Sequence, residues 1–163
     1  MTGRTAAGTL LSLLVFTAAR RPAGAQEGAR PGPRLVVRAD AILARATAVQ
    51  GAVGLTLPLG NYVRLDAVGG GGVERSSGAS RGSARADLVA RFVFDPFRQA
   101  RRGAYAGAGL GALRSEGSWG AYLLAVAGVE GPPAGPFLPA VELGLGRGLR
   151  FGVVLRGAVR GRR

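Results

Sequence analysis

Apolar and polar residues alternate strictly along the segment Ser83–Phe94, which reads S-A-R-A-D-L-V-A-R-F-V-F. Every second residue from the second position onward is apolar, and the intervening positions include Arg85, Asp87 and Arg91. Successive side chains of a β-strand point to opposite faces, so the segment predicts a strand with one apolar and one charged face. A helix would instead scatter the three charges around its circumference. Twelve residues at about 3.3 Å each span roughly 40 Å, enough to cross a ~30 Å hydrocarbon core at a tilt of ~45°.

The same alternation recurs along the rest of the chain, and it predicts eight strands separated by turns. The predicted strands are Arg34–Ala41, Thr47–Leu57, Tyr62–Val68, Ser83–Phe94, Ala104–Leu113, Trp119–Glu130, Phe137–Arg147 and Leu149–Arg160. Gly69–Gly82, which begins with four consecutive glycines and contains a serine-rich stretch, is predicted to be the longest loop and a mobile one. Short amphipathic strands joined by such turns are typical of an antiparallel up-and-down β-barrel. The predicted fold class is therefore all-β.

The first 25 residues have the features of a secretory signal peptide. Arg4 supplies the positive start, Leu10–Ala19 forms a short apolar core, and Ala23–Ala25 is a small-x-small cleavage site. The apolar core is too short for a membrane-spanning helix, which needs ~20 residues. Two arginines that follow the apolar core are unusual in a signal peptide, so an uncleaved anchor or a misassigned start is the alternative.

Residues 26–33 contain two prolines and two glycines, and we expect them to form a leader segment rather than a structural element. The β-barrel domain is then expected to occupy residues 34–163. A chain of 163 residues has room for one such domain. Its 29 glycines include many on predicted strands, where small residues suit a narrow, strongly twisted barrel.

The sequence contains neither cysteine nor histidine. Disulfides, thiolate zinc sites, cysteine nucleophiles and lipoprotein acylation are therefore excluded, and a Ser-His-acid triad cannot be built. The glycine clusters Gly107–Gly111 and Gly144–Gly148 lack the spacing of a G-x-G-x-x-G motif, and neither G-K-[ST] nor G-x-S-x-G occurs. We interpret these clusters as strand glycines. The sequence predicts no catalytic residue, no cofactor and no metal site.

The formal charge of +13 raises the question of an acidic partner. The arginines are spread over alternating strand positions and chain ends, without interleaved aromatic residues or a recognisable reading helix, so we expect no nucleic-acid partner. Anionic lipid or lipopolysaccharide headgroups fit arginines near a membrane surface better.

Alternation by itself leaves open which face of the sheet meets water. A soluble sandwich or a lipocalin-like barrel would turn its apolar face inward, whereas a membrane barrel would turn it toward lipid. The apolar faces are rich in alanine, which would fill a soluble core poorly, and the opposite faces are rich in glycine, which suits the tight lumen of an eight-stranded barrel. These features favour the membrane arrangement. Aromatic residues near predicted strand ends are candidates for interfacial girdles: Tyr62, Phe94, Phe97, Trp119 and Phe137.

Four acidic residues on the predicted strands could in principle pair for acid–base chemistry or bind a hard cation: Asp40, Asp66, Asp87 and Glu142. Each has an arginine within two positions or on a plausible neighbouring strand, which favours ion pairs inside the barrel. The expected pairs are Arg64 with Asp66, Arg85 with Asp87, and Glu142 with Arg150 or Arg156. The predicted lumen charge network comprises Arg64, Asp66, Arg85, Asp87, Arg91, Glu142, Arg150 and Arg156.

With its signal peptide, eight amphipathic strands and glycine-rich lumen positions, the chain over about Arg34–Arg160 resembles small outer-membrane β-barrel proteins of the OmpA/OmpX type. The resemblance implies a monomer in the outer membrane of a Gram-negative-type bacterium, in contact with outer-membrane lipid, lipopolysaccharide and other envelope proteins. It implies a structural or interaction role without catalysis, because the barrel lipases of such membranes would need a catalytic serine and histidine. The alternative is a soluble periplasmic or secreted lipocalin-like barrel that binds a small apolar ligand.

Overall fold

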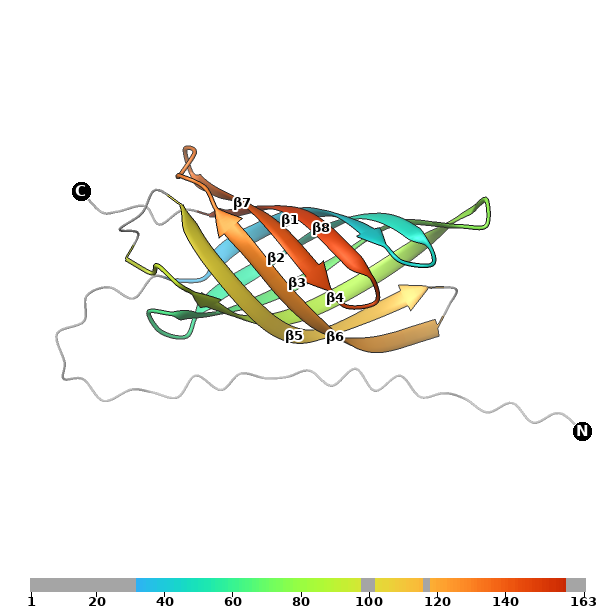
Figure 1. Cartoon of the computed structure of the whole chain (residues 1–163), viewed down its shortest axis with the longest axis horizontal. Helices are drawn as coiled ribbons and strands as arrows, with labels where there is room; N and C mark the ends of the chain where they lie inside the picture. Colours follow the sequence, from blue (N-terminus) through green and yellow to red (C-terminus); the bar gives the residue numbers. More distant parts are fainter. Residues whose placement is uncertain (1–31, 98–101, 116–117, 158–163) are drawn as a thin grey trace, which may run out of the picture.

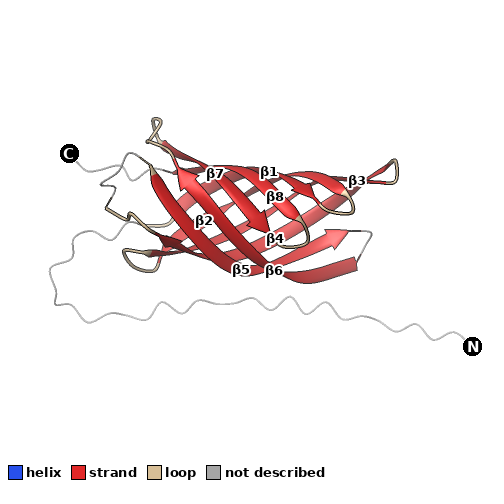
Figure 2. Cartoon of the chain, in the orientation of Figure 1, coloured by secondary structure: helices blue, strands red, loops and turns tan. Residues whose placement is uncertain are grey.

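The computed structural model describes residues 32–97, 102–115 and 118–157, and its regular structure consists of β-strands (Figures 1 and 2). The strands are β1 (Arg34–Leu43), β2 (Thr47–Pro58), β3 (Val63–Ser76), β4 (Ala79–Val93), β5 (Gly103–Ser115), β6 (Ser118–Glu130), β7 (Phe137–Leu145) and β8 (Leu149–Gly157). Each strand pairs antiparallel with the next, and β8 pairs with β1 to close the barrel. The predicted fold class is confirmed. Within the described residues, no helix is long and apolar enough to span a membrane.

The largest departure from the predicted strands is at Gly69–Gly82, where the predicted loop is wrong. β3 continues through the glycines and β4 begins soon after them, so that only Ser77 and Gly78, both at positive φ, form the turn. A Cβ atom added to Gly72 would lie 2.6 Å from the Cα atom of Gln50 on β2. Glycine is therefore needed in this segment so that β2 and β3 can approach closely, although the composition of the segment resembles that of a flexible linker.

Three of the sequence predictions concern parts of the chain beyond the described residues. The predicted signal peptide at residues 1–25 lies entirely outside them, as does most of the predicted leader at 26–33. The last three residues of the eighth predicted strand, 158–160, also fall outside.

The strands place apolar side chains on the outside of the barrel and charged side chains inside it. On β4, Leu88 exposes 47% of its surface, whereas its neighbour Asp87 exposes 3% and Arg91 exposes 1%. The interior also holds two small apolar clusters, one around Val36 and Val154 and another formed by residues of β4 and β6. The burial pattern alternates with the period of two that the sequence shows.

The two ends of the barrel differ in their connections. β1 begins and β8 ends at one end, which we call the terminal end, and the opposite end is called the turn end (Figure 1). Turns 44–46, 77–78 and 146–148 lie at the turn end, whereas the longer connections 59–62 and 131–136 lie at the terminal end. β6 and β7 share only six paired positions, against fourteen for β3 and β4. The wall formed by β3 to β6 therefore rises above the β7–β8 side at the turn end.

Two glycines on β2 provide a test of how the barrel is packed. A Cβ atom added to Gly54 would lie 2.6 Å from the Cα atom of Val68 and would collide with the carbonyl oxygen of Ala67, whereas one added to Gly51 would meet nothing within 4 Å. We expect Gly54→Ala to lower the free energy of unfolding by about 1–3 kcal/mol, the usual range for overpacking. We expect Gly51→Ala to leave the free energy of unfolding unchanged. Urea unfolding followed by the fluorescence of Trp119, the single tryptophan, measures both, and equal losses would contradict the close approach of β2 and β3.

Candidate functional site

The inward-facing residues bring five arginines and five carboxylates into the closed interior. The buried charged residues are Arg38, Asp40, Asp66, Arg85, Asp87, Arg91, Glu130, Glu142, Arg150 and Arg156. Their formal charges cancel. The excess positive charge of the chain therefore lies outside this group.

Asp40 and Asp87 anchor the half of the network nearer the turn end. Arg38 donates two hydrogen bonds of 2.8 Å to the carboxylate of Asp40, one from Nε and one from Nη2, and Arg85 donates to the same carboxylate from β4. Asp87 accepts a 2.8 Å hydrogen bond from Nη1 of Arg150, and its Oδ2 atom lies 3.8 Å from Nη1 of Arg85. The contacts join β1, β4 and β8 across the barrel.

Asp66 and Glu130 anchor the half nearer the terminal end. Arg91 donates to both oxygens of Asp66, over 2.5 Å from Nε and 3.0 Å from Nη2. Oε1 of Glu130 lies 3.6 Å from Nη1 of Arg91 and 3.5 Å from Nη1 of Arg156. The guanidinium carbons of the two arginines lie 4.8 and 5.0 Å from the ring centroid of Tyr105, within the range of cation–π contacts.

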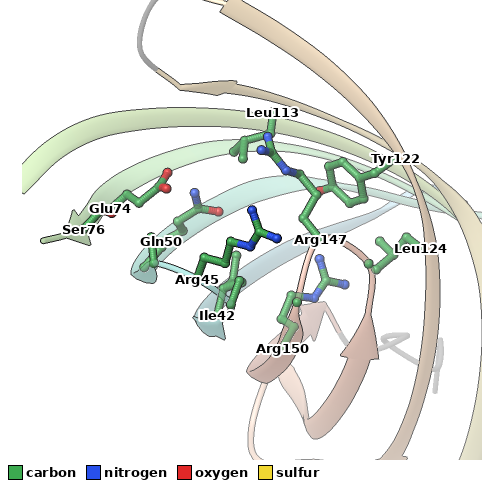
Figure 3. Close-up of a pocket in the computed structure, with 15 residues that line it drawn as sticks. Ile42, Arg45, Gln50, Glu74, Ser76, Leu113, Tyr122, Leu124, Arg147 and Arg150 are labelled. Carbon is green, nitrogen blue, oxygen red and sulfur yellow. The ribbon is translucent and has the colours of Figure 1, made fainter.

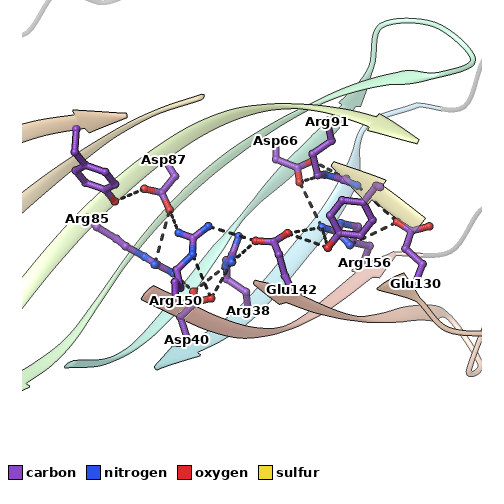
Figure 4. A network of polar contacts seen from close by, with 12 residues as sticks. Arg38, Asp40, Asp66, Arg85, Asp87, Arg91, Glu130, Glu142, Arg150 and Arg156 are labelled. Carbon is purple, nitrogen blue, oxygen red and sulfur yellow. Dashed lines mark hydrogen bonds and ion pairs between the residues drawn. The ribbon is translucent and has the colours of Figure 1, made fainter. Parts of the chain in front are cut away.

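Glu142 on β7 connects the two halves, as Figure 4 shows. Its Oε1 atom accepts hydrogen bonds from Nη2 of Arg38 at 2.7 Å and from Nη2 of Arg150 at 3.3 Å. Its Oε2 atom accepts a 2.9 Å hydrogen bond from the hydroxyl of Tyr105 and lies 3.5 Å from Nη2 of Arg156. The buried charges thus form one continuous network along the interior.

Seven of the eight residues proposed from the sequence are buried in this network: Asp66, Arg85, Asp87, Arg91, Glu142, Arg150 and Arg156. Arg64 is half-buried, and it lies opposite Pro58 at the start of β3. Within the network, Asp66 pairs with Arg91 on β4, and its Oδ2 atom also lies 3.6 Å from Nη2 of Arg156 on β8. Glu142 contacts both arginines that the sequence offered as alternatives.

Asp40 was expected to form an ion pair inside the barrel but was not placed in the predicted network, and several other network residues were not proposed at all: Arg38, Tyr105, Tyr122 and Glu130. The charged residues among them occupy inward-facing positions of their strands, so the alternation of the sequence alone could have identified them. The tyrosines carry a different signal, because each lies directly across the ladder from a glycine: Tyr105 from Gly128, and Tyr122 from Gly111. A Cβ atom on either glycine would overlap the facing ring. A tyrosine placed opposite a glycine thus indicates an aromatic ring that covers the glycine.

The described part of the chain holds no group of three or more acidic, histidine or cysteine side chains arranged to bind a metal ion. The carboxylates of the network instead face guanidinium groups.

A closed eight-stranded antiparallel barrel with apolar residues outside and ion pairs inside is the architecture of small outer-membrane β-barrels. No protein-family model and no curated protein sequence matches the chain. It is similar in fold to a de novo designed transmembrane β-barrel, with 17% sequence identity and a TM-score of 0.56 over 80% of this chain and 98% of that one.

Two natural proteins show the same likeness. The N-terminal β-barrel domain of Pseudomonas aeruginosa OprF has 17% identity and a TM-score of 0.52, over 78% of this chain and 99% of that one. Neisserial surface protein A has 12% identity and a TM-score of 0.56, over 78% of this chain and 96% of that one. The resemblance to small outer-membrane barrels expected from the sequence is confirmed for the fold.

Arg91 tests the contribution of the network to stability. Arg91 is 1% exposed, and Arg91→Met would remove a positive charge that neutralises the buried carboxylates of Asp66 and Glu130. We expect the free energy of unfolding to fall by about 3–5 kcal/mol, as for other broken buried ion pairs. The double variant with Asp66→Asn should lose less than the sum of the two single variants.

The matched control is Arg75→Met, because Arg75 is exposed near the turn end of β3. We expect its effect to stay within about 0.5 kcal/mol, as for most surface substitutions. Urea unfolding of the four variants measures these differences. Equal losses for Arg91→Met and Arg75→Met would show that the network does not stabilise the fold.

Proposed function

We propose that the chain is an integral outer-membrane β-barrel of a Gram-negative-type bacterium, with a structural or interaction role in the cell envelope. The observation that carries the proposal is the outward placement of large apolar side chains, with Leu123 exposed by 78% and Val141 by 65%. Soluble proteins rarely expose apolar surface that is continuous around the molecule, whereas hydrocarbon solvates it.

The backbone also suits a membrane. In a closed barrel every strand has a partner on both sides, and this satisfies the backbone polar groups that hydrocarbon cannot. At the terminal end, the ring of Tyr62 stacks on Phe92 at 5.5 Å and meets Phe97 edge-on at 6.3 Å. Trp119 lies exposed near the turn end. Exposed aromatic residues near both ends fit the two interfacial girdles of a membrane barrel.

The interior supports a role other than transport or catalysis. Arg91 and Arg156 are each 1% exposed, and the network that contains them spans the narrow interior. An open aqueous channel needs a wider barrel, since eight strands leave room for little more than side chains. The carboxylates are engaged by arginines, so none is left to act as a nucleophile or base. We therefore expect a barrel that acts through its surface and its ends.

Partners that fit the outer surface are outer-membrane lipids and lipopolysaccharide. Arg45, Arg75 and Arg147 are exposed at the turn end, where they can meet anionic headgroups. The soluble alternative would need an apolar pocket inside the barrel. A hollow of about 820 Å³ is instead lined largely by outward-facing apolar side chains, among them Phe151. A membrane protein that contacts envelope components as a monomer is the better account.

Substitution of Leu88 tests whether lipid or water surrounds the barrel. Leu88→Arg would place a guanidinium on the outward face of β4, and we expect a loss of about 2–4 kcal/mol in the free energy of unfolding in lipid vesicles. Ser80→Arg, on the same strand near the turn and opposite Arg75, should lower it by less than about 1 kcal/mol. Gel mobility with and without boiling reports the folded fraction. A monodisperse, β-rich protein in plain buffer that tolerates Leu88→Arg would overturn the membrane assignment.

Ion conduction tests the closed interior separately from the membrane assignment. We expect the folded protein to insert into a planar bilayer without producing a steady ion current, because the network spans the interior. Insertion is verified by protease protection of the bilayer-embedded strands. A stable current through inserted protein would contradict the proposal of a non-conducting barrel and leave the membrane location intact.

A further inference from the structure

A cavity of about 340 Å³ opens at the turn end of the barrel, and we call it the turn-end vestibule (Figure 3). Its polar lining includes Arg45, Gln50, Glu74, Arg147 and Arg150. Apolar contact surface comes from Ile42, Leu113, Leu124 and the ring of Tyr122. The volume lies within the ~300–1,000 Å³ range of small-molecule sites, and an apolar wall with a few convergent polar groups is their usual composition.

Barrel closure brings the two rim arginines of the vestibule together. Arg45 lies in the turn between β1 and β2, and Arg147 lies in the turn between β7 and β8. A Cβ atom added to Gly148 would lie 2.5 Å from the carbonyl oxygen of Leu43 and 2.7 Å from Cβ of Ala44. Glycine at this position therefore allows the two turns to pack together. Both arginine side chains extend into the vestibule (Figure 3).

The rim arginines carry positive charge that no residue in the described part of the chain neutralises. Neither Arg45 nor Arg147 forms a hydrogen bond or ion pair with any residue in the described part of the chain. Arg150 at the floor differs, because it is engaged by carboxylates of the interior network. Glu74 is the one acidic side chain in the lining, and its Oε2 atom accepts a 3.1 Å hydrogen bond from Ser115. Two guanidinium groups at the mouth of one cavity attract an anion.

Gln50 supplies a second, independent indication of a ligand. Its side chain is 2% exposed and lines the vestibule, and its Nε2 atom donates a 2.8 Å hydrogen bond to the hydroxyl of Ser83. Its Oε1 atom has no hydrogen-bond partner within the described residues. Turning the amide over changes which atom Ser83 contacts and still leaves the other one unsatisfied. A buried amide atom of this kind favours a ligand that carries a hydroxyl group.

We propose that the turn-end vestibule binds a small anion that also carries hydroxyl groups, the chemistry of a sugar phosphate. The phosphate would lie between Arg45 and Arg147, and a sugar hydroxyl would pair with the amide of Gln50. The ring of Tyr122 and Leu113 provide apolar surface for the sugar ring. Such a group exists free in solution and as the phosphorylated headgroup of a membrane glycolipid. The vestibule is built from the barrel itself, so this inference does not rest on the proposed function.

Titration calorimetry with glucose 1-phosphate tests the site on the full chain folded in detergent micelles. We expect saturable binding that weakens roughly tenfold or more in Arg45→Ala and in Arg147→Ala, the usual effect of losing a hydrogen bond to a charged group. Arg114→Ala is the matched control, because Arg114 is exposed near the same end but does not line the vestibule. Its affinity should be unchanged.

Two further measurements test the sugar hydroxyl and the phosphate of the ligand separately. Gln50→Met should reduce the affinity for glucose 1-phosphate toward that for inorganic phosphate, while binding of inorganic phosphate itself is unaffected. Neutral glucose should bind far more weakly than glucose 1-phosphate. Boiling-dependent gel mobility checks that every variant is folded, so that a loss of binding is not a loss of fold.

The absence of saturable glucose 1-phosphate binding to the folded protein would overturn the inference. Binding that survives Arg45→Ala/Arg147→Ala, or neutral glucose binding equally well, would overturn it too. Competition by lipopolysaccharide added to the micelles would identify a glycolipid headgroup as the source, and its failure to compete would identify a free sugar phosphate. Retained binding by a protein that does not enter membranes would overturn the proposed function alone.

Discussion

The balance of five arginines and five carboxylates inside the barrel is the constraint on which the rest of the structure depends. A buried charge without a partner is costly, by several kcal/mol even after relaxation, and an eight-stranded barrel has little room to hydrate one. The neutralising contacts join strands that are not neighbours, as when Arg85 on β4 reaches Asp40 on β1. They also oppose register slips, because a shift by one residue would move these charges to the apolar outside.

Glycine provides the space that these long side chains occupy. A Cβ atom added to Gly144 would lie 3.1 Å from Nε of Arg150, and one added to Gly152 would collide with the carboxylate of Asp40. The glycine content of the strands and the buried charges are thus two parts of one arrangement, with small residues on one strand facing large ones on the next. Flexibility is not the reason for glycine at these positions.

Strand number and facing were predictable because alternation with a period of two is a local property, as in β4. Gly69–Gly82 was mispredicted because glycine has no side chain to reveal a face, and the need for it arises only from the contact between β2 and β3. The same alternation also identified most of the charged side chains that point into the barrel. It could not select partners, because the pairing of Asp66 with Arg91 depends on the register of β3 against β4.

The vestibule and the ion-pair network share Arg150, which lines the former and contacts Asp87 and Glu142 of the latter. The short ladder between β6 and β7 leaves the vestibule walls uneven, while Arg150 joins the lining of the vestibule to the network. A group that enters from the turn end therefore meets a charged floor rather than a passage. An anion held above Arg150 would also compete electrostatically with the two carboxylates for the same guanidinium. If the vestibule binds an anion as proposed, its occupancy would be coupled to the ion-pair network through Arg150.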